Sequence, residues 1–368
     1  MNRADEQFMR ECFRLAEKGR GFVSPNPLVG AVLVKSGRIV ACGYHHRFGG
    51  AHAEIDCLNR YRGDCSNATL YVNLEPYEHR GKTPPCTDRI IQAGVRRVVA
   101  AMKDPNPLVS GRGIGRLRRA GIRVDVGVLQ DEARELNRHF VRHITARRPY
   151  VHVKIAQTFD GFIAGRNSQP RWISSIPSRR LVHRWRAEHD AVLVGAGTVL
   201  ADNPRLDVRL VRGRSPAVVI LDGRLNVPYG SRLLKRDVPI YLFAAAAAMR
   251  RKPLKAARLR AMGIMIVPLR AERGGRVPLD EVLGELYMRN IGSVLVEGGS
   301  EVFAQFLYEG PVDQVSIFLA PCVLGSGIPA FGLEAGRRRF RTAFKADRMV
   351  AAKVGRDILI QAYSELGG

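Results

Sequence analysis

Short apolar runs alternate with helix-like segments along the whole of this sequence. "ATLYVNLEP" (68–76) is followed by "TDRIIQAG" (87–94), and "SVLVEGG" (293–299) is followed by a helical pattern near 300–308. A short apolar run bounded by turn residues predicts a buried strand, and the helices between such strands cover the faces of the sheet. The alternation therefore predicts a layered α/β architecture.

The length of the chain favours two domains over one. A chain of 368 residues exceeds the size at which a single hydrophobic core stops growing. The pattern of the first half closes with a helix predicted over 131–144, and "TARRPY" (145–150) has the composition of a linker. "YVHVKIAQT" (150–158) then starts a second series of strands. We therefore predict one domain over 1–145 and another over 150–366.

The net charge of +25 calls for anionic partners, either nucleic acid or phosphorylated small molecules. The basic residues are scattered in pairs and triples, such as Arg96-Arg97 and Arg179-Arg180. They lack the interleaved aromatic residues on which the bases of a single strand would stack. Dispersed charge of this kind favours a solvated arginine-rich surface over a dedicated nucleic-acid face.

The sequence shows no sign of export or of membrane insertion. Near the N-terminus, Met9, Cys12, Phe13 and Ala16 recur at helical spacing, which predicts an amphipathic helix rather than a signal peptide. The six cysteines are irregularly spaced and form no Cys-x-x-Cys pair, so free thiols are expected. Because the apolar runs are also too short to span a bilayer, we expect a cytoplasmic protein without a membrane partner.

A histidine, a glutamate and a cysteine follow the pattern of zinc-dependent deaminases. His52 and Glu54 open a predicted helix, and Cys86 ends the segment "LEPYEHRGKTPPC" (74–86), which begins at a predicted strand end. These enzymes bind zinc through a histidine and two thiolates, while the glutamate carries protons. The metal lowers the pKa of bound water from about 15.7 to about 7. His-x-Glu alone is a weak signal, but its combination with this loop is specific.

Two glycine turns indicate a candidate phosphate site in the second domain. "VLVEGGSEVFAQFL" (294–307) is typical of a strand, a Gly298-Gly299 turn and a helix opened by Ser300. Glycines let the backbone approach a phosphate, and the N-terminus of the next helix attracts it. An ordinary strand–helix turn is the alternative. The second turn, "GAGT" (195–198), lacks the full spacing and the acidic partner of a dinucleotide fingerprint.

In this combination and order the chain resembles the bifunctional pyrimidine deaminase-reductases of bacterial riboflavin biosynthesis, over essentially its whole length. The segments that carry the resemblance are "SPNPLVGAVLV" (24–34), "AHAEI" (51–55), "LEPYEHRGKTPPC" (74–86), "AMKDPNPLVSGRGI" (101–114), "KIAQTFDGFIA" (154–164), "RWIS" (171–174), "VGAGTVLADNPRLDVR" (194–209) and "VEGGSEVFAQFL" (296–307). The resemblance implies an N-terminal cytidine-deaminase-like three-layer domain and a C-terminal dihydrofolate-reductase-like domain.

The resemblance also implies roles for residues of the first domain. His52 and Cys86 match two zinc ligands, and Glu54 matches the proton carrier. The residues that match positions around the phosphorylated pyrimidine substrate are Asn26, His45, His79, Lys82 and Asn106. The family's middle zinc ligand, a cysteine directly after Glu-Pro, falls at Tyr77.

Tyr77 is a poor replacement for a thiolate. A phenol has a pKa of about 10 and must lose its proton to bind a metal well. Its oxygen also lies several ångströms further from the backbone than a cysteine sulfur. Two protein ligands hold zinc far more weakly than three. The sequence therefore predicts an impaired or silent deaminase centre, with a fully bifunctional enzyme and an unusual zinc site as the alternative.

In the second domain the resemblance implies two neighbouring sites. The residues that match the NADPH site are Ala156, Trp172, Thr198, Asp202, Gly299 and Ser300. Those that match the site of the ribose-phosphate substrate are Arg186, Leu206, Arg209 and Glu297. The arginines make physical sense there, because a planar guanidinium matches the oxygens of a phosphate.

The expected activity is therefore NADPH-dependent reduction of 5-amino-6-(5-phosphoribosylamino)uracil to the ribitylamino product, next to a zinc deaminase domain that Tyr77 impairs. The expected partner is a phosphorylated pyrimidine, with no nucleic acid, and the family implies a homo-oligomer. A nucleic-acid binder or a tRNA-base deaminase is the alternative of another class, motivated by the net charge and by the His-x-Glu motif.

Overall fold

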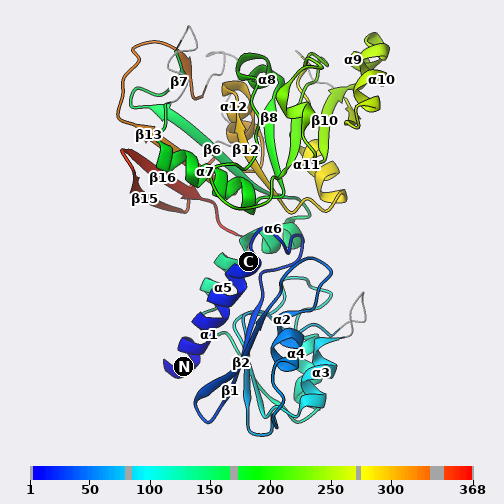
Figure 1. Cartoon of the computed structure of the whole chain (residues 1–368), viewed down its shortest axis with the longest axis vertical. Coiled ribbons are helices and arrows are strands. Elements are labelled where there is room, and N and C mark those ends of the chain that lie inside the picture. Colours follow the sequence, from blue (N-terminus) through cyan, green and yellow to red (C-terminus); the bar gives the residue numbers. More distant parts are fainter. Residues whose placement is uncertain (1–2, 79–84, 166–172, 271–274, 332–343, 367–368) are drawn as a thin grey trace. The chain divides into compact units, whose positions relative to one another are not determined.

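The computed structural model describes residues 3–78, 85–165, 173–270, 275–331 and 344–366. It consists of two compact units, Met1–Arg147 and Arg148–Gly368 (Figure 1). Among the described residues, no helix is both long and apolar enough to cross a membrane.

The first unit is built on a five-stranded sheet with the strand order β2-β1-β3-β4-β5. β1 runs antiparallel to both of its neighbours, whereas β3, β4 and β5 are parallel. The strands are β1 (Gly30–Lys35), β2 (Arg38–Tyr44), β3 (Thr69–Val72), β4 (Arg97–Ala100) and β5 (Arg123–Val126). The helices are α1 (Arg3–Ala16), η1 (Glu17–Gly19), α2 (Ala53–Asn59), α3 (Cys86–Ala93), α4 (Arg112–Arg119), α5 (Gln130–Leu136) and α6 (Arg138–Ala146).

Helices cover both faces of this sheet, as the alternation of side chains along β1 shows. Val32 points to one face and packs with Met9 of α1, in a cluster that α5 and α6 also join. Leu33 points to the other face and packs in a cluster with Leu58 of α2 and Leu117 of α4. Successive strand residues face opposite sides, so one strand contributes to both cores. The predicted three-layer arrangement of the first domain is confirmed.

One helix of the first unit differs from its prediction. The segment 131–144 was expected to form a single helix, but the chain breaks at Asn137 into α5 and α6. Asn137 is buried, its Oδ1 accepts a hydrogen bond from Leu28 N at 2.7 Å, and its Nδ2 donates to Leu28 O at 3.0 Å. A buried amide that pairs with both backbone groups of a distant residue outweighs local helix propensity. The break thereby anchors the loop that carries Asn26.

The second unit is built on a nine-stranded sheet with the order β11-β10-β9-β8-β12-β6-β13-β16-β15, parallel as far as β13 and antiparallel beyond it. The strands are β6 (Tyr150–Thr158), β8 (Ala191–Gly195), β9 (Ala217–Leu221), β10 (Ile240–Ala245), β11 (Met265–Leu269), β12 (Ser293–Gly298), β13 (Gln314–Ala320), β15 (Arg348–Val354) and β16 (Asp357–Tyr363), with β7 (Phe162–Ala164) and β14 (Ile328–Pro329) as a separate pair. The helices are α7 (Ile176–Glu188), α8 (Ala196–Asp202), η2 (Arg232–Lys235), α9 (Ala246–Arg251), α10 (Pro253–Ala261), α11 (Leu279–Met288) and α12 (Ser300–Glu309).

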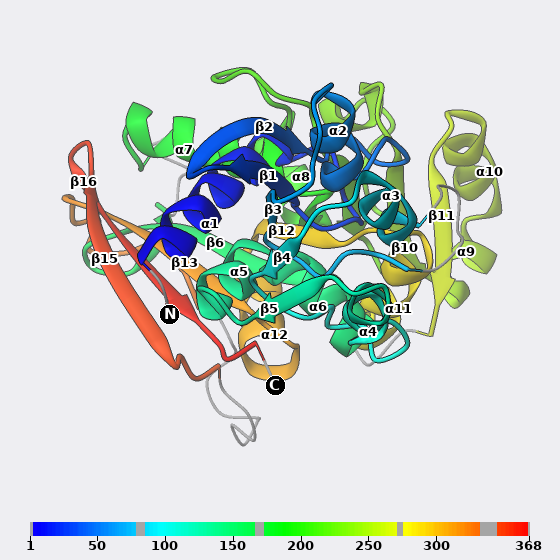
Figure 2. The ribbon, with the colours of Figure 1, turned by 90° about the horizontal axis from the view of Figure 1, so that it is seen from below.

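The order of the central strands places a topological switch point at the middle of this sheet. β8 leads through α8 to β9 on one side, whereas β12 leads through α12 to β13 on the other side (Figure 1). Neighbouring parallel strands whose connections leave in opposite directions open a crevice at their carboxyl ends, and ligands of α/β proteins bind there. The β15–β16 hairpin lies at one edge of the same sheet and β11 at the other (Figure 2).

An ion-pair network ties α1 to the sheet of the first unit. Arg97 Nη1 and Nη2 donate to the carboxylate of Asp5 at 2.9 Å each, and Arg97 Nε donates to Asp125 at 2.7 Å. Tyr71 Oη donates to Asp5 at 2.7 Å. The hydrogen bonds from Arg97 hold the pKa of Asp5 below its usual value, although burial opposes this.

We expect Arg97→Leu to destabilise the first unit by about 3 kcal/mol, because it leaves the carboxylate of Asp5 nearly buried without its cationic partner. Arg123→Leu is the matched control. Arg123 also pairs with Asp125, but its side chain is 72% exposed, so the cost should stay below about 1 kcal/mol.

Urea unfolding measures both variants. Circular dichroism follows the whole chain, whereas tryptophan fluorescence follows the second unit, since Trp172 and Trp185 both fall in that half of the sequence. For Arg97→Leu we expect the first unit to unfold at a lower urea concentration, in a transition that circular dichroism detects and tryptophan fluorescence does not. Equal stability of the two variants would contradict the role assigned to this network.

Candidate active sites

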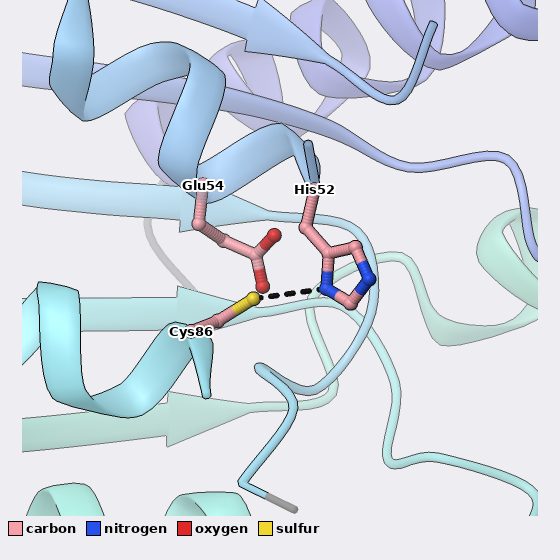
Figure 3. A group of neighbouring side chains, drawn as sticks. All are labelled: His52, Glu54 and Cys86. Atoms are coloured by element: carbon pink, nitrogen blue, oxygen red, sulfur yellow. Dashed lines mark hydrogen bonds between the residues drawn. The ribbon is translucent and has the colours of Figure 1, made fainter. Parts of the chain in front are cut away.

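Three of the predicted deaminase residues meet at the starts of two helices. His52 directly precedes α2, Glu54 lies in its first turn, and Cys86 opens α3. His52 Nδ1 and Cys86 Sγ are 3.0 Å apart, and one donor atom from each of the three residues lies within 4.8 Å of the others (Figure 3). Nitrogen, sulfur and carboxylate donors at this separation are suited to a transition metal such as zinc.

Burial sets the protonation of this cluster. It raises the pKa of Glu54, and it raises the pKa of Cys86 well above its ordinary value, with the neighbouring Glu54 adding to the effect. Burial also lowers the pKa of His52. A carboxyl group whose pKa is raised toward neutrality is suited to carry protons, as the sequence predicts for Glu54.

Two further predicted residues line the same pocket. His45 Nδ1 donates to Ala51 O at 2.9 Å, which leaves Nε2 to accept a hydrogen bond from Asn26 Nδ2 at 3.1 Å. Burial lowers the pKa of His45 and so favours this neutral form. The rings of His45 and His52 meet edge to face, with centroids 5.6 Å apart. The structure therefore brings Asn26 and His45 to the His52 cluster, while the predicted His79 and Lys82 lie outside the described residues.

Glu75, which the sequence analysis did not single out, anchors the loop at this pocket. Its carboxylate accepts hydrogen bonds from Asp104 N at 3.2 Å, Gly111 N at 2.9 Å and Ile114 N at 3.2 Å. The last two lie at the N-terminus of α4, where a negative charge is favoured. Asn106 lies on the loop that Glu75 holds, and its Oδ1 accepts from Leu108 N at 3.0 Å.

Tyr77 follows this anchor directly, and its own backbone is also held. Its carbonyl accepts from Thr87 N at 3.3 Å. The carbonyl of Pro76 packs so closely on Gly113 that a Cβ there would lie 2.0 Å from it. The ring of Tyr77 meets that of His52 edge to face, with centroids 5.9 Å apart.

The oxygen of a phenol lies further from the backbone than the sulfur of a thiol, so Tyr77 does not reproduce the position of a cysteine ligand. His52 and Cys86 are suited to hold a metal together with Glu54. Tyr77 stands where the sequence analysis expects the remaining ligand of a three-ligand zinc site.

Two helices begin at the carboxyl ends of the neighbouring strands β8 and β12. α8 begins at Ala196 after β8, and α12 begins at Ser300 after β12. Gly299 has a φ of 94°, which a residue with a side chain rarely adopts, and a Cβ on Gly298 or Gly299 would lie 3.0 Å from Thr198 Oγ1. Free N–H groups beside bare glycine backbone fit the phosphates of a dinucleotide such as NADPH.

The other residues predicted for the cofactor are placed as follows. Ala156 lies on β6, which pairs with β12 beside the crevice. Asp202 ends α8 and is exposed. Ser300 opens α12, and its Oγ donates to the carbonyl of Pro329, the last residue of β14, at 2.6 Å. Trp172 lies outside the described residues.

A buried ion pair marks the predicted substrate site. Arg186 on α7 donates to both oxygens of Glu297 on β12 at 2.5 and 2.8 Å, with 11% and 6% of the two side chains exposed. Burial works to raise the pKa of Glu297, but Arg186 and then Lys154 outweigh it and lower that pKa. Burial lowers the pKa of Lys154. The sequence analysis missed Lys154, although a lysine within an apolar central strand is a usable signal.

The remaining predicted residues lie on one loop beside this pair. Arg186 Nη1 donates to Asp207 O at 3.0 Å, and Arg209 N donates to His183 Nδ1 at 3.1 Å. The guanidinium of Arg209 pairs with the carboxylate of Asp207. Arg186, Leu206, Arg209 and Glu297 are therefore neighbours in the structure, and His183 is a further residue of this cluster that sequence reasoning did not find.

Comparisons with known proteins match both units of the chain to known families. The model of the RibD C-terminal domain matches residues 149–358, and the model of the cytidine and deoxycytidylate deaminase zinc-binding region matches residues 2–102. The chain is 41% identical over 358 residues to the riboflavin biosynthesis protein RibD of Aquifex aeolicus, which covers 97% of each chain. It is 42% identical over 323 residues to RibD of Bacillus amyloliquefaciens, which covers 87% of this chain and 85% of the relative.

Solved structures extend the match to three dimensions. The diaminohydroxyphosphoribosylaminopyrimidine deaminase/5-amino-6-(5-phosphoribosylamino)uracil reductase of Thermotoga maritima superimposes with a TM-score of 0.85 at 38% identity, over 98% of each chain. RibD of Acinetobacter baumannii superimposes with a TM-score of 0.85 at 30% identity, again over 98% of each chain. The predicted pair of folds, deaminase-like and then reductase-like, is confirmed.

The environment of His183 leads to a prediction about its titration. Burial, together with the charges of Arg186 and Arg209, lowers its pKa to about 4. The free ring has a pKa of about 6.5, so the unfolded chain takes up the proton more readily. The stability that the neutral ring contributes should be complete above that pH and be lost as the pH falls toward 4.

The check is NMR of the protein with ¹³C-labelled histidine, with the signal of His183 assigned by its loss in His183→Asn. We expect no titration of this signal between about pH 5.5 and pH 8. A midpoint near the ordinary histidine pKa would show that the ring is not held as a neutral acceptor.

Proposed function

The chain belongs to the RibD family of riboflavin biosynthesis proteins, and on this premise we propose that its second unit reduces 5-amino-6-(5-phosphoribosylamino)uracil to the ribitylamino product with NADPH. The observation that carries the proposal is the buried Arg186–Glu297 pair, which lies on β12 and α7 beside the glycine turn at the crevice. Buried ion pairs add little to stability, so a pair retained next to a phosphate-binding turn points to ligand binding.

One set of residues at the carboxyl ends of β8 and β12 is proposed to bind the cofactor, and a neighbouring set is proposed to bind the substrate. Gly299 and the N-terminus of α12 would hold the cofactor phosphates, with Ala156, Thr198, Asp202, Ser300 and Trp172 as the proposed remainder of that site. NADPH supplies a hydride to C1 of the open-chain ribosyl group. The protein's part is to hold that carbon in place and to supply the proton that the reduction consumes.

The proposed substrate side carries several charged groups. Arg186 and Arg209 offer guanidinium groups to the sugar phosphate. Glu297 offers a buried carboxylate to hydroxyl or amino groups of the substrate. Leu206 lies on the loop that carries Arg209 and is a further proposed contact. Lys154, whose pKa burial lowers, is a half-buried cation beside Glu297, and we assign proton delivery to it.

The test of the reductase is NADPH oxidation with 5-amino-6-(5-phosphoribosylamino)uracil. We expect Arg186→Gln to lower kcat/KM roughly 100-fold, the loss expected for two charge-assisted hydrogen bonds of about 1.5 kcal/mol each. NADPH affinity should remain unchanged. Arg180→Gln removes an exposed arginine from the same helix and should behave as the parent. A parent chain that does not oxidise NADPH with this substrate would refute the proposal.

For the first unit we propose a family-type pyrimidine deaminase domain whose zinc centre is weakened by Tyr77. Glu54 would carry protons, His52 and Cys86 would be the remaining ligands, and Asn26, His45, His79, Lys82 and Asn106 would surround the substrate. The support for impairment is the backbone that Glu75 and Gly113 hold in place around Tyr77. A fully bifunctional enzyme with an unusual zinc site is the second candidate, favoured by the intact His52 cluster.

The decisive variant is Tyr77→Cys, with Tyr77→Phe as the control that removes only the phenol oxygen. We expect about one zinc per chain by metal analysis and ammonia release from the diaminopyrimidine substrate in Tyr77→Cys alone, since only this change completes a three-ligand site. The reductase rate should be the same in all three proteins. Stoichiometric zinc and ammonia release in the parent would instead establish the bifunctional enzyme.

The edge strand of the large sheet and the distribution of charge bear on which macromolecules this chain contacts. We infer self-association through β15, which is exposed along almost its whole length and ends the large sheet, with Met349 63% and Val350 44% exposed. We infer no nucleic-acid partner, because the basic residues are scattered rather than gathered on one element. Six free cysteines support a reducing compartment, the cytoplasm.

A further inference from the structure

We propose that Arg236 and His183 are positioning residues that fix the loop 203–209 in the conformation the substrate needs. This inference rests on the proposed reductase function, because Leu206 and Arg209 of that loop are proposed substrate contacts. We call residues 203–209 the substrate loop.

The backbone of the substrate loop adopts a conformation that its own residues do not favour. Asn203 and Leu206 have φ values of 42° and 53°, in the left-handed region. For a leucine this conformation costs roughly 1–2 kcal/mol and persists only where surrounding structure imposes it. Leu206 is also buried, with 4% of the residue exposed. The conformation of the substrate loop must therefore be imposed by groups outside it.

Arg236 supplies the first of these groups. It follows η2, and its Nη1 donates to Leu206 O at 3.0 Å while its Nη2 donates to Pro216 O at 3.3 Å. One planar guanidinium thus binds the carbonyl of the strained residue and the carbonyl just before β9. An ammonium is a point charge on a flexible stem and cannot reproduce this two-pronged geometry.

His183 supplies the second group, from α7. Its Nδ1 accepts from Arg209 N, and Arg186, three residues later on the same helix face, donates to Asp207 O. The neutral ring is the form that can accept this hydrogen bond. α7 therefore fixes the end of the substrate loop that carries Arg209, as Arg236 fixes its middle at Leu206.

These contacts separate substrate binding from cofactor binding. Arg236 acts on backbone carbonyls of the loop, whereas the glycine turn proposed for the cofactor lies on β12 and α12. Loss of Arg236 should let Leu206 relax to an ordinary backbone conformation and carry Arg209 away from its place. The effect should fall on the KM for the ribosylaminouracil phosphate and spare the affinity for NADPH.

The experiment compares Arg236→Ala and Arg236→Lys with the parent, in the full chain. We expect KM for the substrate to rise about tenfold in Arg236→Ala and less in Arg236→Lys, with kcat within about twofold and the NADPH dissociation constant unchanged. Guanidinium ion at millimolar concentration should restore much of the KM in Arg236→Ala. Lys235→Ala removes the exposed neighbouring charge and should leave every constant unchanged.

His183 is tested in parallel by two variants. His183→Asn keeps a side-chain acceptor and should retain most of the affinity for substrate, whereas His183→Leu should raise KM as Arg236→Ala does. An unchanged KM in Arg236→Ala and His183→Leu overturns the inference. So does a loss of NADPH binding in step with substrate binding, and if Arg236→Ala does not fold, Arg236→Lys decides. A parent without any reductase activity refutes the proposed function instead.

Discussion

The buried pairing of Arg186 with Glu297 connects the elements that surround the proposed substrate site of the second unit. Taking two charges out of water costs several kcal/mol for each ion, and their mutual attraction repays this only when the geometry is good. The bidentate contact meets that condition, and the third donor of Arg186 reaches the carbonyl of Asp207. One guanidinium thus joins α7, β12 and the substrate loop. The pair thereby places two charged groups close to the carboxyl end of β12, which neighbours β8.

The first unit depends on a different kind of constraint, a carboxylate that holds backbone. Glu75 fixes the loop on which the metal ligand should lie, and Gly113 lets Pro76 approach α4 closely. Such rigidity suits catalysis because ligands are held in place before the metal arrives. On the proposal made above, the same rigidity limits how far the loop adapts to the longer side chain of Tyr77. The two units therefore differ in what holds their proposed sites in place. Pairs of charged side chains do so in the second unit, and contacts to the backbone do so in the first.

Much of this organisation follows from local sequence, and some of it does not. The alternation of apolar runs predicted the layers, and the deaminase pattern together with the family resemblance grouped His52, Glu54 and Cys86, which the structure brings together. The single helix over 131–144 was wrong because Asn137 binds Leu28, which is distant in sequence. Lys154, His183 and Glu75 were missed for a related reason. Their partners lie on other elements, so their roles become visible only when the strand order is known.

At the proposed zinc centre, the departure from the ligand pattern that the family resemblance implies falls on one side chain, Tyr77. His52, Glu54 and Cys86 already lie together in the structure, and the ring of Tyr77 meets that of His52. Tyrosine and cysteine codons differ by a single base. One point mutation would therefore place a second cysteine at this centre without any other change to the domain.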